Sequence, residues 1–317
     1  MNWGSCQSCL NNESVYIKTM KTTTSWVEIF ITTVIKVAGY SAILFVLAIF
    51  IFLMTEGLPA IREVSLRAMF SQRWYHIESY YGILPLILGT VLVTIGAALI
   101  AVPVGVGTAI YIAEVAPRWA REILKPLVEV MAGVPSVVLG FIGIIVLASA
   151  LRQTLSLPTG LTAFAGSLLL GAIAIPTIVS VAEDSLDAVP RSYRDAALAL
   201  GATRWQTIWK VTLPAARSGV ITAIMLGIGR AIGETMTVMM VTGNAPVMPT
   251  RLSSLFAPAR TMTATIAAEM GEVATDSTHY HVLFLIGIIL FLISLAVNLT
   301  ASAVLLRQRK RNERILS

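Results

Sequence analysis

Two opposite charges interrupt a long apolar stretch of the sequence. Arg230 and Glu234 are the only charged residues between Ser218 and Thr250. Arg230 follows Arg217 by thirteen positions, a distance of about 20 Å along a helix that rises 1.5 Å per residue. If this helix crosses a bilayer, Arg230 lies inside the hydrocarbon, where a guanidinium has to face protein or water and have a partner.

Glu234 is expected on the same helical face, one turn after Arg230. The two side chains could form an ion pair that fixes helix packing, helped by the close approach that Gly229 and Gly233 allow. Alternatively, Arg230 could contact an anion that crosses the membrane, because guanidinium offers forked donors to tetrahedral oxyanions. In that case Glu234 would neutralise Arg230 whenever no anion is bound.

A polar loop, residues 183–217, precedes this apolar stretch. We expect a short helix over Asp195–Leu200, a break at Gly201, and a second helix over 203–212 that ends before Pro214. The second helix carries two tryptophans four positions apart, which share one face. Such a helical hairpin could dock a partner protein or lie on the membrane surface.

The loop contains the pattern D-A-A-x3-G-x9-V-x-L-P, which resembles the EAA loop of ABC importer permeases, E-A-A-x3-G-x9-I-x-L-P. Asp195 and Val211 replace the usual Glu and Ile, and both changes are conservative. In that family the loop supplies the coupling helix that sits in a groove of the ATP-hydrolysing subunit. The resemblance therefore assigns ATPase coupling to Asp195, Ala196, Ala197 and Gly201.

The composition is that of an integral membrane protein, with 56% hydrophobic and 13% charged residues in 317. Six runs are apolar enough and long enough to cross the roughly 30 Å hydrocarbon core. The second is expected to be one long, tilted or kinked helix with its bend at Pro103. The runs cover about 30–55, 80–113, 126–150, 161–182, 218–243 and 281–306.

Basic residues occur in short clusters between these runs, as topology signals do, so the net charge of +6 does not indicate nucleic acid. Sixteen of the 23 Lys and Arg residues fall on one side, which the positive-inside rule places in the cytoplasm with both termini. We expect a polar cytoplasmic segment 1–29, a first transmembrane helix with an extracytoplasmic segment 30–82, a permease core 83–306 of five helices with the coupling loop 183–217, and a basic cytoplasmic tail 307–317.

Further runs resemble the PstC-type permease of the phosphate-specific ABC importer over roughly residues 65–300. In that family the Arg and Glu of the R-A-x-G-E motif are implicated in phosphate passage, and they match Arg230 and Glu234. The sister PstA-type permease shares R-A-I-G-E-T, but the continuation into M-T-V and G-N favours the PstC type. The matching runs are YGILPLILGT, IAVPVGVGTAIYIAEVAP, AGVPSVVLGFIG, GIGRAIGETMTVMMVTGN and TATIAAEMGEVA.

The resemblance implies an all-α protein of the inner (cytoplasmic) membrane with six transmembrane helices and the type I ABC importer permease fold. It also implies a second homologous permease, an ABC ATPase dimer docked on the 195–214 loop, and an extracytoplasmic phosphate-binding protein. The sequence contains no P-loop and no hydrolase motif. The chain is therefore expected to be no enzyme and to bind no cofactor, with ATP held by the partner ATPase.

Two other classes stay open. An ATP-independent anion carrier or channel would explain Arg230 but not the D-A-A loop, whereas a receptor or assembly scaffold would explain the loop but not the buried Arg. Among importers, sulfate or molybdate is the nearest alternative substrate, since one Arg does not distinguish tetrahedral oxyanions.

Several polar residues are weaker candidates. Ser136, Thr177 and Asn244 could donate hydrogen bonds to an oxyanion, or bond to their own or a neighbouring helix. No third ligand of clear spacing accompanies His279 and His281, so no metal site is expected. Cys6 and Cys9 form a lone C-x-x-C that we interpret as incidental. A solvated face, or a contact with the binding protein, is expected for Glu269, Glu272 and Asp276.

Overall fold

The computed structural model describes residues 26–316. Cys6 and Cys9 lie outside these residues, so their interpretation stays a prediction. By its internal contacts the chain divides into two units, of which the first ends at Phe52 and the second begins at Leu53.

Among residues 26–316, six helical stretches are long and apolar enough to cross a membrane, which confirms the predicted number. Their lengths run from 19 to 36 residues, and about 20 are needed to cross the hydrocarbon core. They cover Glu28–Glu63, Leu84–Val115, Ser136–Thr154, Ala163–Asp187, Arg204–Gly233 and Thr278–Thr300.

All residues of the first unit that the structure describes, 26–52, belong to α2 (Trp26–Gly57). Its apolar side chains point in all directions and are exposed in this single chain, from Ile29 to Phe52. A helix that is apolar on every face is suited to lipid or to membrane-embedded neighbours.

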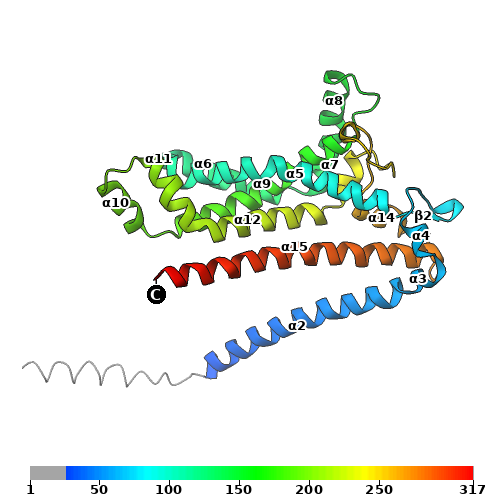
Figure 1. Cartoon of the computed structure of the whole chain (residues 1–317), viewed down its shortest axis with the longest axis horizontal. Coiled ribbons are helices and arrows are strands. Elements are labelled where there is room, and N and C mark those ends of the chain that lie inside the picture. Colours follow the sequence, from blue (N-terminus) through cyan, green and yellow to red (C-terminus); the bar gives the residue numbers. More distant parts are fainter. Residues whose placement is uncertain (1–25, 317) are drawn as a thin grey trace, which may run out of the picture. The chain divides into compact units, whose positions relative to one another are not determined.

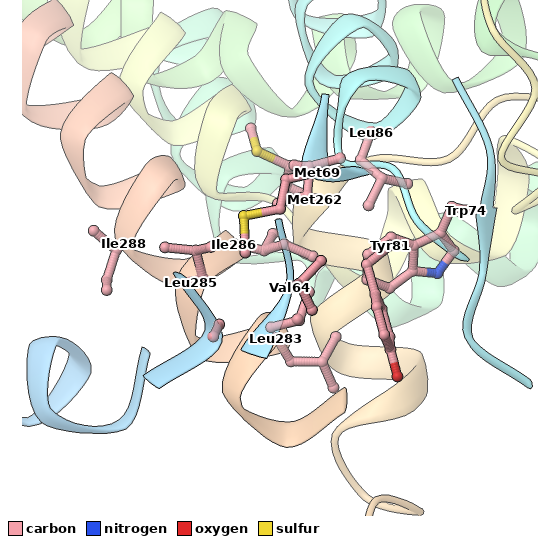
Figure 2. Close-up of a cluster of buried hydrophobic side chains, with 13 residues drawn as sticks. Val64, Met69, Trp74, Tyr81, Leu86, Met262, Leu283, Leu285, Ile286 and Ile288 are labelled. Carbon is pink, nitrogen blue, oxygen red and sulfur yellow. The ribbon is translucent and has the colours of Figure 1, made fainter. Parts of the chain in front are cut away.

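The second unit begins with short elements that form a small apolar core. The antiparallel strands β1 and β2 place Trp74 opposite Tyr81. Figure 2 shows Trp74 and Tyr81 beside each other, in the same apolar cluster as Leu283 and Ile286 of α15. This cluster holds the hairpin 74–81 against the start of α15. The elements are α3 (Pro59–Glu63), α4 (Leu66–Met69), β1 (Trp74–Tyr75), η1 (His76–Glu78) and β2 (Tyr80–Tyr81).

Three long helices form the centre of the second unit, and α9 contacts both of the others (Figure 1). The helix of α5 continues through Pro103 into a π-turn, and α9 continues through Pro176, so each is one unbroken span as predicted. Ile178 of α9 is fully buried among apolar side chains of this centre. The elements are α5 (Leu84–Ile110), its π-turn η2 (Tyr111–Val115), α9 (Ala163–Asp187) and α12 (Leu213–Gly233).

The predicted third span, 126–150, is wrong in its first part. Residues Arg118–Gly133 form a separate helix, α6, and the apolar span begins only at Ser136. The break lies at Val134, which has extended backbone (φ −67°, ψ 127°) because the ring of Pro135 disfavours the helical conformation of the residue before it. The span then runs through α7 (Ser136–Ile142), η3 (Gly143–Ala148) and α8 (Ser149–Thr154).

The predicted fifth span, 218–243, is also interrupted, because α12 ends at Gly233 and a new helix begins at Met236. Towards the C-terminus the chain ends in the long helix α15, of which the structure describes only the backbone over the basic tail 307–316. The remaining elements are α10 (Arg191–Ala199), α11 (Arg204–Thr207), η4 (Ile208–Thr212), α13 (Met236–Val241), η5 (Leu252–Phe256), α14 (Met262–Glu269) and α15 (Thr278–Leu316).

The start of α5 packs closely on the segment that leads into α14. The hydroxyl of Thr90 accepts a hydrogen bond from the N–H of Met262 at 3.0 Å. At the preceding residue, Gly89, an added Cβ atom would overlap the carbonyl oxygen of Arg260. This contact therefore fixes the position of Arg260 relative to α5.

Gly89→Ala is expected to lower the melting temperature of the protein purified in detergent. Overpacking typically costs about 1–3 kcal/mol. The Cβ atom at Gly89 would overlap backbone, which does not move aside as a side chain can, so we expect a cost at the upper end of this range, above the roughly 1 kcal/mol that Ala gains over Gly inside a helix. Gly107→Ala, in the same helix, is the matched control, since nothing lies within 4 Å of a Cβ atom there. It should melt at or slightly above the wild-type temperature, and equal melting of the two variants would contradict the close contact.

Candidate functional site

Arg230 lies in the last turn of α12, near the end of a helix that also contains Arg217. Its Nη1 donates to Thr177 Oγ1 at 3.0 Å and its Nη2 donates to the carbonyl oxygen of Ala132 at 3.4 Å. These partners come from α9 and α6, and both are neutral. A cation in the last turn is also favoured by the helix dipole.

Among the described residues, Arg230 has no carboxylate within ion-pair distance. The residue is exposed in this single chain, so its guanidinium is not enclosed by the chain's own core. Because its present partners are neutral, an oxyanion would give this guanidinium stronger hydrogen bonds to an opposite charge, with the bidentate geometry that guanidinium allows. This arrangement is chemically suited to anion binding.

The predicted pairing of Arg230 with Glu234 is wrong in this structure. α12 ends at Gly233, a poor helix former, and Glu234 is extended (φ −70°, ψ 127°), so it does not lie one turn further along the same face. Its Oε1 instead accepts from the N–H of Thr237 at 3.3 Å, in the first turn of α13. Glu234 is thus a helix-capping group here and not a counterion of Arg230.

Ser136 is the first residue of α7, directly after the helix break at Val134 and Pro135. Its carbonyl oxygen accepts a hydrogen bond from Thr237 Oγ1 at 2.8 Å, and α7 and α13 are in contact. The hydroxyl of Thr177 accepts a hydrogen bond from Arg230, so in this structure it bonds to the neighbouring helix α12. Asn244 is used elsewhere, since its Oδ1 accepts from Arg260 Nε at 2.9 Å. Two broken helices therefore meet where Glu234 and Ser136 lie.

The polar loop forms two helices joined at Gly201, as predicted, although α10 begins four residues earlier, at Arg191. Gly201 has φ +82°, a left-handed conformation that favours glycine. A capping box follows, in which Thr203 and Gln206 bond to each other's backbone N–H. The sharp turn and this cap start α11 in a fixed direction.

The prediction that the second loop helix ends before Pro214 is wrong. α11 passes through the π-turn η4 directly into α12, which makes one helix of 30 residues, Arg204–Gly233. Proline lacks an N–H and crowds the carbonyl four residues earlier. Hydrogen bonds in a π-turn reach one residue further, so the wider turn next to Pro214 accommodates its ring without ending the helix.

Three of the four residues assigned to coupling are accessible in this chain. Asp195, Ala196 and Gly201 are exposed, whereas Ala197 is buried and contributes to packing. The rings of Trp205 and Trp209 lie 5.8 Å apart on one exposed face, which confirms their predicted common side. We call the exposed apolar side chains of this loop the loop patch; they are Tyr193, Leu198, Leu200, Trp205 and Trp209.

Arg194 connects the loop to the end of α5, a contact that the sequence does not reveal. Its Nε and Nη2 donate to Glu114 Oε1 at 3.0 and 2.6 Å. Further bonds go to the carbonyl oxygens of Leu186 and Val189. The Glu114 side chain is 9% exposed, so this is a largely buried ion pair that ties α10 to both α5 and the end of α9.

A second unpredicted ion pair joins α6 to α9. Lys125 Nζ lies 2.9 Å from Glu183 Oε2, and the Glu183 side chain is buried. The hydrogen bond to Glu183 is the main cause that raises the pKa of Lys125, and the nearby Asp184 adds to it. The lysine therefore stays charged and neutralises a carboxylate near the end of a membrane span.

The solvated acidic face expected over residues 269–276 is wrong for Glu269. α14 ends at that residue, so Glu272 and Asp276 do not continue its helical face, and both are exposed. Glu269 is buried, with Oε1 2.7 Å from Arg260 Nη1 and 3.1 Å from Trp74 Nε1. Burial raises the pKa of Glu269, but His279, Arg260 and Trp74 together hold it below its ordinary value.

Comparison with known proteins identifies the family. Residues 101–312 match the sequence profile of the binding-protein-dependent transport system inner membrane component family. The chain is 42% identical over 252 residues to the probable ABC transporter permease protein YqgH of Bacillus subtilis, covering 78% of this chain and 81% of that protein. It is 36% identical over 275 residues to the phosphate transport system permease protein PstC of Xylella fastidiosa, covering 80% and 83%.

Solved structures of ABC importers share the fold. One match is a bacterial alginate ABC transporter, solved in complex with an alginate-bound periplasmic protein. The match covers 88% of this chain and 96% of the transporter's chain, with a TM-score of 0.58 at 16% identity. The MetNI methionine ABC transporter covers 73% and 98% with a TM-score of 0.53 at 18% identity. These likenesses confirm the importer permease fold. Together with the profile match and the sequence relatives, they show that the chain belongs to the family of binding-protein-dependent transport system inner membrane components.

Proposed function

We propose that this chain is the membrane-spanning permease subunit of an ATP-driven importer that moves inorganic phosphate across the inner membrane. The observation that carries this proposal is Arg230, a guanidinium about 20 Å along a membrane helix from Arg217, whose described partners are neutral oxygens. Such a group binds a tetrahedral oxyanion well. The relatives that are named phosphate transport system permeases support phosphate as this oxyanion.

The family consists of inner membrane components, so the chain is a multi-pass inner membrane protein and not an enzyme. We assign ATP hydrolysis to a separate ABC ATPase dimer, for which the loop patch on α10 and α11 provides a docking surface. A second homologous permease would complete the pore. The family name implies a binding protein, and we assign to it the delivery of phosphate from outside.

The proposed orientation places the loop 183–217 and both termini in the cytoplasm, as the distribution of Lys and Arg favours. ATP binding would draw the two coupling loops together and open the pore to the outside, and hydrolysis would return it. Arg230 would lie on the route of the anion, with Thr177 as a neighbouring hydroxyl. Ser136 and Glu234, at the two helix interruptions, would lie near the same route.

The test is uptake of radiolabelled phosphate by cells that lack other phosphate importers and that express this chain with its proposed partners. We expect saturable uptake that requires ATP and that excess unlabelled sulfate or molybdate does not reduce. Competition by sulfate or molybdate would show that the assigned substrate is wrong, and the assignment to the importer class would stand. Uptake that continues without the ATPase would favour an anion carrier or channel, and absence of all uptake with intact ATPase binding would favour a scaffold.

A further inference from the structure

The fold brings three side chains with metal-binding chemistry together from distant parts of the sequence. His76 begins η1 in the hairpin, Glu269 ends α14, and His279 lies at the start of α15. Figure 2 shows the apolar cluster, including Trp74 and Tyr81, that packs these segments together. The juxtaposition follows from this packing and is not visible in the spacing of the sequence.

Both imidazole rings present a nitrogen to the Glu269 carboxylate. His279 Nε2 lies 3.1 Å from Oε2 and His76 Nδ1 lies 3.8 Å from Oε1. One ligand atom from each of the three side chains lies within 4.8 Å of the others. Ligand atoms around tetrahedral Zn²⁺, at bonds of about 2.1 Å, are separated by roughly 3.4 Å. A formed site would need the three atoms to move closer together, and His76, whose side chain is 40% exposed, has the most room to move.

Glu269 Oε2 and His279 Nε2 are both buried and lie 3.1 Å from each other, but this contact lacks hydrogen-bond geometry and neither atom has another hydrogen-bond partner among the described residues. Their side chains are 8% and 9% exposed, so bulk water does not solvate them. Buried polar atoms are nearly always paired, and an unpaired one calls for an explanation such as an ion. A cation between the two would satisfy both atoms at once.

The other carboxylate oxygen is already held in place. Arg260 Nη1 and Trp74 Nε1 both bind Glu269 Oε1, at 2.7 and 3.1 Å, and Arg260 is itself fixed by Asn244. Metal-binding carboxylates commonly have such outer partners, which orient the free oxygen towards the ion. Oε1 is thus the anchored oxygen and Oε2 the available one.

We propose that His76, Glu269 and His279 form a binding site for a divalent transition metal ion of the Zn²⁺ class. Two imidazoles suit zinc, copper, iron or nickel, whereas Mg²⁺ and Ca²⁺ prefer sites made only of oxygen ligands. The positive charge of Arg260 next to the carboxylate further disfavours ions that are held by charge alone. Three protein ligands would leave the fourth position of a tetrahedral ion to water. The ion would join the hairpin to the junction of α14 and α15.

The test uses the full chain, purified in detergent, stripped with a chelator and titrated with Zn²⁺ alone. Cys6→Ser and Cys9→Ser are introduced first, since that C-x-x-C pair could bind zinc independently. We expect one Zn²⁺ per chain and a rise in melting temperature on binding. X-ray absorption at the zinc edge should show nitrogen and oxygen ligands.

His76→Ala and His279→Gln are each expected to weaken Zn²⁺ binding at least about tenfold and to abolish the rise in melting temperature. His76 is the safer variant, because its side chain lies near the surface. His281→Gln is the matched control; its ring bonds to the carbonyl oxygen of Glu56 and lies outside the cluster. It should bind Zn²⁺ like the parent. Absence of saturable binding in the parent, or equal affinity in His76→Ala, would overturn the proposal.

Discussion

Arg230→Gln should reduce phosphate uptake about 30-fold or more while the transporter still assembles. Glutamine keeps one amide donor, on a shorter side chain, but removes the charge, and losing one partner of a charge-assisted contact costs about 2 kcal/mol or more. The present hydrogen-bond partners of Arg230, the hydroxyl of Thr177 and the carbonyl oxygen of Ala132, are neutral. The fold therefore depends little on the charge of Arg230. Uptake of radiolabelled phosphate, together with copurification of the ATPase, measures both effects.

Two variants make this result specific to the anion. Thr177→Val removes the hydroxyl partner but keeps the charge, so uptake should fall far less than in Arg230→Gln. Arg67→Gln removes an exposed arginine in α4 and should have no effect. Normal uptake by Arg230→Gln would exclude Arg230 from the anion route. A loss of the assembled complex would instead assign Arg230 to helix packing.

Arg194→Ala should separate ATP hydrolysis from transport. Arg194 makes four hydrogen bonds, two of them to the buried carboxylate of Glu114, and bonds to a charged group contribute about 1.5–3 kcal/mol each. Without them α10 is no longer tied to α5, so a docked ATPase moves the loop without moving the span. We expect phosphate uptake at least about tenfold lower, with ATP hydrolysis by the complex retained.

The matched control is Arg191→Ala, in the same helix, because Arg191 is exposed and forms no ion pair among the described residues. It should transport normally. A double-mutant cycle of Glu114→Gln and Arg194→Gln should show an interaction between the two positions, since each change removes the same contact. Additive effects, or equal losses in Arg191→Ala and Arg194→Ala, would contradict a specific role of this pair.

The spans were predictable because hydrophobicity decides them and the bilayer sets their length. The helices continue through Pro103 and Pro176 as expected, whereas the chain breaks before Pro135. Proline in the sequence does not show which of these outcomes applies. Neighbouring helices and local adjustments of the turn decide whether the lost hydrogen bond is tolerated.

The choice of residues for the candidate site stays a prediction, and part of the geometry expected for them is wrong. Arg230 was recognisable because a charge in an apolar run is costly, but its partners Thr177 and Ala132 are 53 and 98 positions away. Glu234 was placed on the face of Arg230 by assuming that the helix continues, and the break after Gly233 removes that relation. Glu269 looked solvated because its helical spacing does not reveal the tertiary contact with Trp74, which buries its carboxylate.

The π-turn beside Pro214 has a mechanical consequence. It keeps the backbone helical from Arg204 to Gly233, with Trp205 near one end and Arg230 near the other. Proline and π-turns are also the places where helices bend, and the chain changes direction between α11 and α12 (Figure 1). A displacement of the tryptophan end therefore reaches the guanidinium only through this bend. The angle of the bend decides how far Arg230 moves when the loop moves.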